Sequence, residues 1–140
     1  MRIFFDNCTS PVLAEVLNAY VRTEGGAARH VRDMTDYDFR HDTPDIDWIE
    51  RLHQDRPADW IVLTSDLRIS RNKANRAAWL RCGLKGFVLA SGFQKTPTNQ
   101  VASTLLWRWP EMENFIRSAA PGSLFELPVK RSSGFKALTV

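Results

Sequence analysis

The chain has 140 residues, a hydrophobic content of 44% and a formal net charge of +3. This length and apolar fraction suit one domain with a single buried core. The two cysteines, Cys8 and Cys82, lie in unrelated contexts, which excludes a disulfide framework and favours a reducing compartment, so we expect a cytoplasmic protein. No apolar run approaches the roughly 20 residues that span a bilayer, and we expect no membrane partner.

The beginning of the chain predicts a strand followed by a helix. Residues 2–5 form a short apolar run, typical of a buried strand, that stops at Asp6. Ser10-Pro11 supplies an N-cap and a first-turn proline, and apolar residues then recur at helical spacing. Residues 29–34 indicate a weaker second strand.

A second helix and a central strand are predicted in the middle of the chain. Thr43-Pro44 resembles another cap-plus-proline helix start, and Pro57 should end that helix. Residues 60–64 form a continuous apolar run, which is typical of a strand covered on both faces in a parallel sheet. This run also leads to an acid, Asp66.

The remaining elements alternate between helix and strand. We expect a helix capped by Ser70 and running to Cys82, a strand over 86–90, a helix from Thr98 that Pro110 kinks or divides, a last strand within 124–129, and a flexible tail over 130–140. Strands separated by helices predict one three-layer α/β domain over residues 1–140, with a central, mostly parallel sheet. Tryptophans are more often core residues than base-stacking platforms, and we expect this of Trp48, Trp60, Trp79, Trp107 and Trp109.

Acidic and basic residues are segregated along the chain. Nine acids lie between residues 33 and 59, whereas no acid occurs between Asp66 and Glu111. Several bases follow Asp66 at once, namely Arg68, Arg71, Lys73 and Arg76, and they could track the phosphates of a polyanion. A solvated helix face explains these bases equally well.

Aspartates at the ends of predicted strands suggest a metal site. Ligands of parallel α/β sheets bind outside the carboxyl ends of the strands, where Asp6 and Asp66 fall. Asp45 and Asp47 open the second helix, and only one of them need be a ligand. Converging carboxylates repel each other unless a hard cation lies between them, and oxygen ligands favour Mg²⁺ or Mn²⁺ with activated water. Asn7, Thr64 and Ser65 could orient that water or a ligand carboxylate.

Each acid also has a structural explanation. Asp6 could make an Asx-turn between strand and helix, and Asp66 could open a turn. Asp45 and Asp47 lie where the helix dipole favours acids in any case.

Three short motifs, in this order, resemble those of the PIN-like family, in particular short bacterial chains grouped with VapC-type toxins. They are Phe4-Phe5-Asp6-Asn7, then Thr43-Pro44-Asp45-Ile46-Asp47-Trp48-Ile49, and then Val62-Leu63-Thr64-Ser65-Asp66 with the bases after it. The resemblance covers roughly residues 2–120, the size of one domain. It implies a metal-dependent ribonuclease, with Asp6, Asp45 and Asp66 as catalytic residues that hold Mg²⁺ or Mn²⁺, and Asp47 as a substitute for Asp45.

The resemblance also implies partners and leaves alternatives open. The chain would be a toxin that cleaves RNA and is inhibited by a cognate antitoxin protein. A homodimer is a further expectation. Related chains often carry another acid in the helix after the third motif, where this chain has Asn72 and Asn75, of which either could stand in. The second hypothesis is therefore a non-catalytic PIN-like module that binds RNA or a protein. The third takes residues 6–9 as a degenerate phosphatase loop, although the second acid of such a loop is missing.

Overall fold

The computed structural model describes residues 1–55 and 59–140, and its elements alternate between strand and helix. In chain order they are β1 (Arg2–Phe5), α1 (Pro11–Val21), η1 (Arg22–Glu24), β2 (Ala27–His30), η2 (Val31–Asp33), η3 (Thr35–Tyr37), α2 (Asp45–Asp55), β3 (Trp60–Thr64), α3 (Arg68–Arg71), α4 (Lys73–Cys82), β4 (Lys85–Leu89), η4 (Ser91–Lys95), α5 (Thr98–Arg117), β5 (Leu124–Leu127) and β6 (Lys136–Leu138). Pro57, expected to end α2, lies outside the described residues.

The strands form one sheet in the order β2-β1-β3-β4-β5-β6 across the described part of the chain. Every neighbouring pair is parallel except β5 and β6, which run antiparallel. The chain passes from β1 outward to β2 and then back across to β3, so the order reverses between β1 and β3. In open α/β sheets such a reversal leaves a crevice at the carboxyl ends of the strands, which places the expected ligand site between β1 and β3.

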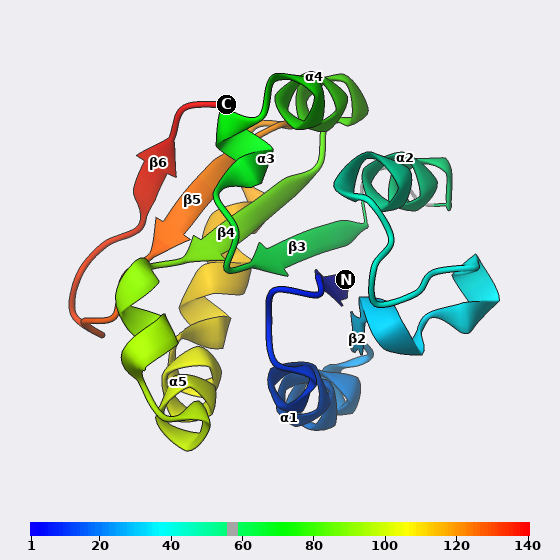
Figure 1. Ribbon diagram of the computed structural model, residues 1–140. Coiled ribbons are helices and arrows are strands. Elements are labelled where there is room, and N and C mark those ends of the chain that lie inside the picture. The colour runs from blue at the N-terminus through cyan, green and yellow to red at the C-terminus, as the bar shows by residue number, and fades with distance from the viewer. Residues whose placement is uncertain (56–58) are drawn as a thin grey trace.

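Helices cover both faces of the sheet, as Figure 1 shows with α1 and α5 on one side and α2 and α4 on the other. Alternating residues of β1 enter different cores, with Ile3 and Phe5 against α1 and α5, and Phe4 against α2 and α4. Strand β3 divides in the same way, because successive side chains of a strand point to opposite faces. The prediction of a three-layer α/β domain with a mostly parallel sheet is confirmed.

The start of α1 follows the predicted local signals. The Ser10 side chain accepts a hydrogen bond from the Val12 amide at 3.3 Å, and Pro11 is the first helical residue. The cap leaves Asp6 outside the helix, so its carboxylate is not needed to begin α1.

The structure corrects one predicted helix start and shows that α5 is not divided. Ser70 is not a helix cap: it lies in α3, and its hydroxyl donates to the carbonyl of Leu67, the residue before α3. Asn72 caps α4 by accepting the Asn75 amide at 3.0 Å. Asn72 stands directly before the regular turns, which is why it replaces Ser70 in that role. Helix α5 continues through Pro110 as one element, so this proline does not divide the helix, although it removes one of its backbone hydrogen bonds.

The strand predictions hold better for the centre of the sheet than for its edges. The weak strand expected over 29–34 is β2 at Ala27–His30, after which the chain enters the η2 turn. Residues 130–140, expected to be a flexible tail, contain β6, which pairs with β5. A polar edge strand shows little of the apolar alternation that reveals a buried one.

Four of the five tryptophans are buried, as expected, and one is not. Trp107 is 71% exposed on α5, where it lines an apolar groove shared with Val12 and Val16 of α1.

In the described ranges, 1–55 and 59–140, no helix is long and apolar enough to cross a membrane.

Candidate functional site

The loop between β1 and α1 fixes the position of Asp6. The backbone carbonyl of Asp6 accepts hydrogen bonds from the Thr9 hydroxyl at 2.8 Å and the Thr9 amide at 3.2 Å. The buried His30 of β2 donates from Nε2 to the Thr9 carbonyl at 2.9 Å, while its Nδ1 accepts the Arg32 amide. The neighbouring strand β2 therefore fixes the β1–α1 loop through the hydrogen bond from His30 to Thr9.

The Asp6 carboxylate is buried, with 1% of the residue exposed, and both of its oxygens are hydrogen-bonded. Oδ1 accepts the Cys8 amide at 3.2 Å, and Oδ2 accepts the Thr64 hydroxyl at 2.5 Å. Thr64 Oγ1 in turn accepts the Asp66 amide at 3.0 Å. One hydroxyl at the end of β3 thus connects Asp6 with the loop that carries Asp66.

Asp66 is paired with Arg68. Its Oδ1 accepts the Arg68 backbone amide at 2.9 Å, and its Oδ2 contacts Arg68 Nε in an ion pair. The Arg68 side chain is largely exposed, whereas that of Asp66 is mostly covered. The guanidinium group therefore supplies positive charge beside the acids from the solvent side.

Asp45 is the third acid at this place. Trp48 Nε1 donates to its Oδ1 at 3.1 Å, and Asn75 Nδ2 of α4 donates to its Oδ2 at 3.1 Å. Asn75, one of the two asparagines that could stand in for a fourth acid, therefore reaches the acidic site, where it donates a hydrogen bond to Asp45.

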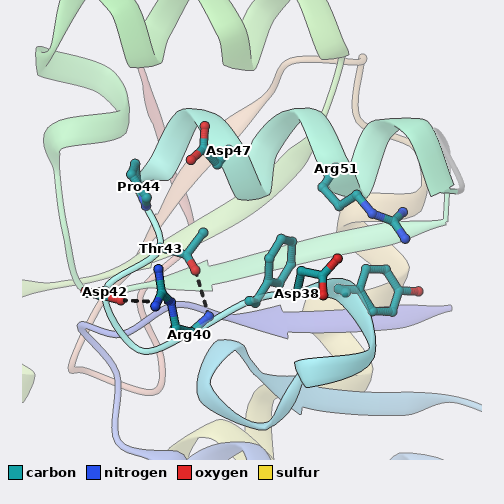
Figure 2. A pocket seen from close by; sticks show the side chains of 9 residues that line it. Asp38, Arg40, Asp42, Thr43, Pro44, Asp47 and Arg51 are labelled. Carbon is teal, nitrogen blue, oxygen red and sulfur yellow. Dashed lines mark hydrogen bonds and ion pairs between the residues drawn. The ribbon is translucent and has the colours of Figure 1, made fainter.

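Asp47 lies in different surroundings. It is exposed and lines a pocket with Arg51 of α2 and with Arg40, Asp42 and Thr43 of the preceding loop, as Figure 2 shows. In this loop the Thr43 hydroxyl accepts the Arg40 amide at 2.7 Å and does not cap α2. Of the two alternatives, the structure brings Asp45 to Asp6 and Asp66.

The acids influence one another electrostatically. Burial raises the pKa of Asp6 from its ordinary value of 3.8 to about 7, the charges of Asp45 and Asp66 add to this rise, and the hydrogen bonds from Thr64 and Cys8 oppose it. Burial and the charge of Asp66 also raise the pKa of Asp45, against the Trp48 hydrogen bond and Arg68. The site concentrates more negative charge than Arg68 balances, which is the condition that a divalent cation relieves.

The donor atoms suit a hard divalent cation, although the side chains do not yet surround one. Three carboxylates offer the oxygen ligands that Mg²⁺ and Mn²⁺ prefer. Within residues 1–55 and 59–140, however, no three His, Cys, Asp or Glu side chains are arranged to hold an ion. Since Arg68 engages both oxygens of Asp66, an ion would have to compete with its guanidinium group. The residues fit a metal by their chemistry, and an ion held by Asp66 would have to displace the Arg68 side chain.

Cys8 is a site residue that the sequence does not reveal. Its Sγ lies 3.5 Å from Asp66 Oδ2 and 3.7 Å from Asn7 Oδ1. Burial and the charges of Asp6 and Asp66 raise the pKa of the thiol to about 11, so it stays protonated at neutral pH and donates S–H. A lone cysteine beside a strand-end acid carries no sequence signal, and only the fold shows the contact.

Two of the four candidate RNA-binding residues share a cavity with Asp66. Arg68 and Arg71 line a cavity of 310 Å³ together with Asp66 and Ser65. Lys73 and Arg76 are exposed in the first turns of α4.

Residues after β4 also reach this cavity. Ser91 and Gln94 line it from the η4 turn, as does Glu126 from β5. The sequence did not single them out, because no motif marks the loop after that strand.

Comparison with known proteins relates this chain to a protein family. The family model described as "PIN like domain" matches residues 1–91, which includes Asp6, Asp45, Asp66 and Asn75. The match is to the family as a whole and does not reach the VapC-type toxins. Neither the curated proteins nor the solved structures give a match. With the family model covering more than half of the sequence, and with a mostly parallel sheet carrying acids at its carboxyl edge, the chain belongs to the PIN-like domain family.

Proposed function

We propose that this protein is a metal-dependent endoribonuclease that hydrolyses RNA phosphodiester bonds. Domains of this family are often nucleases and typically bind divalent metals. The observation that carries the proposal is the convergence of Asp6, Asp45 and Asp66 from separate elements, close enough for their charges to act on one another's ionisation.

Asp6, Asp45 and Asp66 are the residues that would hold the ion, either Mg²⁺ or Mn²⁺. When bound, such an ion lowers the pKa of a water molecule and neutralises charge that develops on the scissile phosphate. Thr64 orients Asp6, and Trp48 and Asn75 orient Asp45. Arg68 and Arg71, at the rim of the same site, contribute positive charge to the phosphate.

A digest of total cellular RNA in the presence of Mn²⁺ tests this proposal. We expect fragments from the wild type and a loss of cleavage in Asp66→Asn on the order of 10²–10³-fold, comparable to the removal of other charge-stabilising groups. Asp47→Asn is the matched control, because Asp47 opens the same helix as Asp45 but is exposed, and it should cleave as the wild type does.

Equal cleavage by the wild type and Asp66→Asn would remove the proposal. RNA binding without fragments, with or without Mn²⁺, would instead favour the non-catalytic module. Asn75 is the specific reason to keep that second function in view, since an amide stands there where related chains often have an acid.

The cellular role we propose is that of a cytoplasmic toxin, with a cognate antitoxin protein and a second copy of the chain as its partners. This role rests on the resemblance of the three acidic motifs to those of VapC-type toxins. Expression of the wild type in a bacterium without the antitoxin should arrest growth, and expression of Asp66→Asn should not. Equal growth of both strains, at matched protein levels, would remove the toxin role.

A further inference from the structure

A second, uncharged pocket opens beside the acids at the carboxyl edge of the sheet. It has a volume of 190 Å³, and its apolar part is formed by the buried side chains of Leu13, Leu89, Phe93 and Val101. The polar part comes from hydroxyl, thiol and amide side chains, among them those of Cys8, Ser65 and Gln94. No Lys, Arg, Asp or Glu belongs to its lining among the described residues.

This uncharged pocket adjoins the candidate catalytic site. Cys8 lines it and is 3.5 Å from Asp66, measured from Sγ to Oδ2. Ser65, which directly precedes Asp66, lines both this pocket and the cavity that holds Arg68 and Arg71. A group bound here would lie next to the atoms that act on a phosphate.

The two cavities differ in charge: two bases, Arg68 and Arg71, and two acids, Asp66 and Glu126, line the 310 Å³ cavity, whereas, in the described part of the chain, only uncharged residues line the 190 Å³ pocket. The 310 Å³ cavity contains Arg71, which is exposed and has no acidic partner within residues 1–55 and 59–140, so it can meet a phosphate. The 190 Å³ pocket combines buried apolar side chains with hydrogen-bonding side chains. The apolar side chains can contact the flat faces of a nucleobase, and the polar ones can hydrogen-bond to its edge. It is smaller than the roughly 300–1,000 Å³ of pockets for drug-sized ligands, which suits a single base.

Gln94 occupies the boundary between the two cavities. It lies in the η4 turn between β4 and α5 (Figure 1), its side chain is exposed, and it lines both cavities. Its amide carries both donors and an acceptor, so it can pair with the edge of a base. We propose that the 190 Å³ pocket binds the base next to the cleaved phosphate and that Gln94 determines which base is accepted. The inference rests on the proposed function, since it takes single-stranded RNA as the substrate.

Cleavage of RNA oligonucleotides with randomised positions tests the inference. Sequencing of the products should show a base preference of the wild type at one position beside the cleaved bond. Gln94→Ala should reduce that preference about tenfold, the scale of one lost amide–base pairing. Gln94→Glu, which only accepts hydrogen bonds, should move it toward bases with an amino group on their edge. Gln100→Ala, an exposed glutamine at the start of α5, is the matched control and should keep the wild-type preference.

A binding measurement separates failure of this inference from failure of the proposed function. Fluorescence anisotropy with single-stranded homopolymers in EDTA reports base preference whether or not the protein cleaves. A wild type that binds one homopolymer preferentially, with the preference lost in Gln94→Ala and kept in Gln100→Ala, supports the pocket even where no cleavage occurs. An unchanged preference in Gln94→Ala and Gln94→Glu, or a wild type without any preference, overturns it. Because Gln94 is exposed, the melting temperatures of these variants should equal that of the wild type.

Discussion

Replacing Asp6 by asparagine should stabilise the metal-free protein at pH 8 while removing its activity. The pKa of Asp6 is raised to about 7 in the folded state, mainly by burial, so the unfolded chain ionises this group at lower pH than the folded chain does. Wild-type stability therefore falls as the pH rises from about 4 to 7, because the unfolded state releases the proton first. The rise in pKa from 3.8 to about 7 corresponds to about 4 kcal/mol at most.

Asparagine avoids this cost but does not reproduce both hydrogen bonds of the carboxylate. Its single oxygen can accept from either Cys8 or Thr64, and losing one bond costs about 1 kcal/mol. We expect a net gain of about 3 kcal/mol at most at pH 8 and a net loss of up to about 1 kcal/mol at pH 4. Chemical denaturation in EDTA at both pH values measures the difference.

The same variant should lose RNA cleavage, by on the order of 10²–10³-fold. Asp47→Asn serves as the exposed control and should leave both the pH dependence of the free energy of unfolding and the RNA cleavage unchanged. An Asp6→Asn variant that is less stable than the wild type at pH 8 would contradict the claim that the charge of Asp6 destabilises the fold. A variant that cleaves RNA normally would contradict the functional role of Asp6.

Replacing Arg68 by glutamine should tighten metal binding and slow cleavage. The Arg68 guanidinium group pairs with Asp66 and also acts on the ionisation of Asp45, so it opposes a divalent ion at the site. Removing that charge should lower the Kd for Mn²⁺ about tenfold, or about 1.4 kcal/mol. The backbone amide of residue 68 still holds Asp66 Oδ1, so the loop should keep its position.

The cleavage rate of Arg68→Gln at saturating Mn²⁺ should fall, because a cation that faces the phosphate is lost. The opposite directions of the two effects distinguish this role from a general loss of folding. Arg76→Gln removes the same charge from an exposed position of α4 and should change the Kd for Mn²⁺ much less. Metal affinity that is unchanged or weaker in Arg68→Gln would show that the arginine does not compete with the ion.

The sequence predicts the centre of the sheet well, since β1 and β3 are short apolar runs that lead to an acid. Parallel strands end at one edge of the sheet, so the nearness of Asp6 and Asp66 follows from the pattern alone. The choice between Asp45 and Asp47 does not, because it depends on the helix α2 packing through Trp48, which also donates to Asp45.

Other parts of the site depend on contacts between distant segments. Cys8 reaches Asp66 across 58 positions of sequence, and Gln94 enters the site from a turn with no motif of its own. Trp107 illustrates the same limit, since composition predicts burial of a tryptophan, whereas its position on α5 directs it to the surface.

The claim that Asp6, Asp45 and Asp66 share one divalent ion is tested most directly by calorimetric titration of Mn²⁺ into the metal-free protein. The wild type should bind one ion, and Asp6→Asn, Asp45→Asn and Asp66→Asn should each weaken binding by about tenfold or more. Asp47→Asn should bind as the wild type does. Wild-type affinity in all three variants, or a loss confined to Asp47→Asn, would contradict a shared metal site.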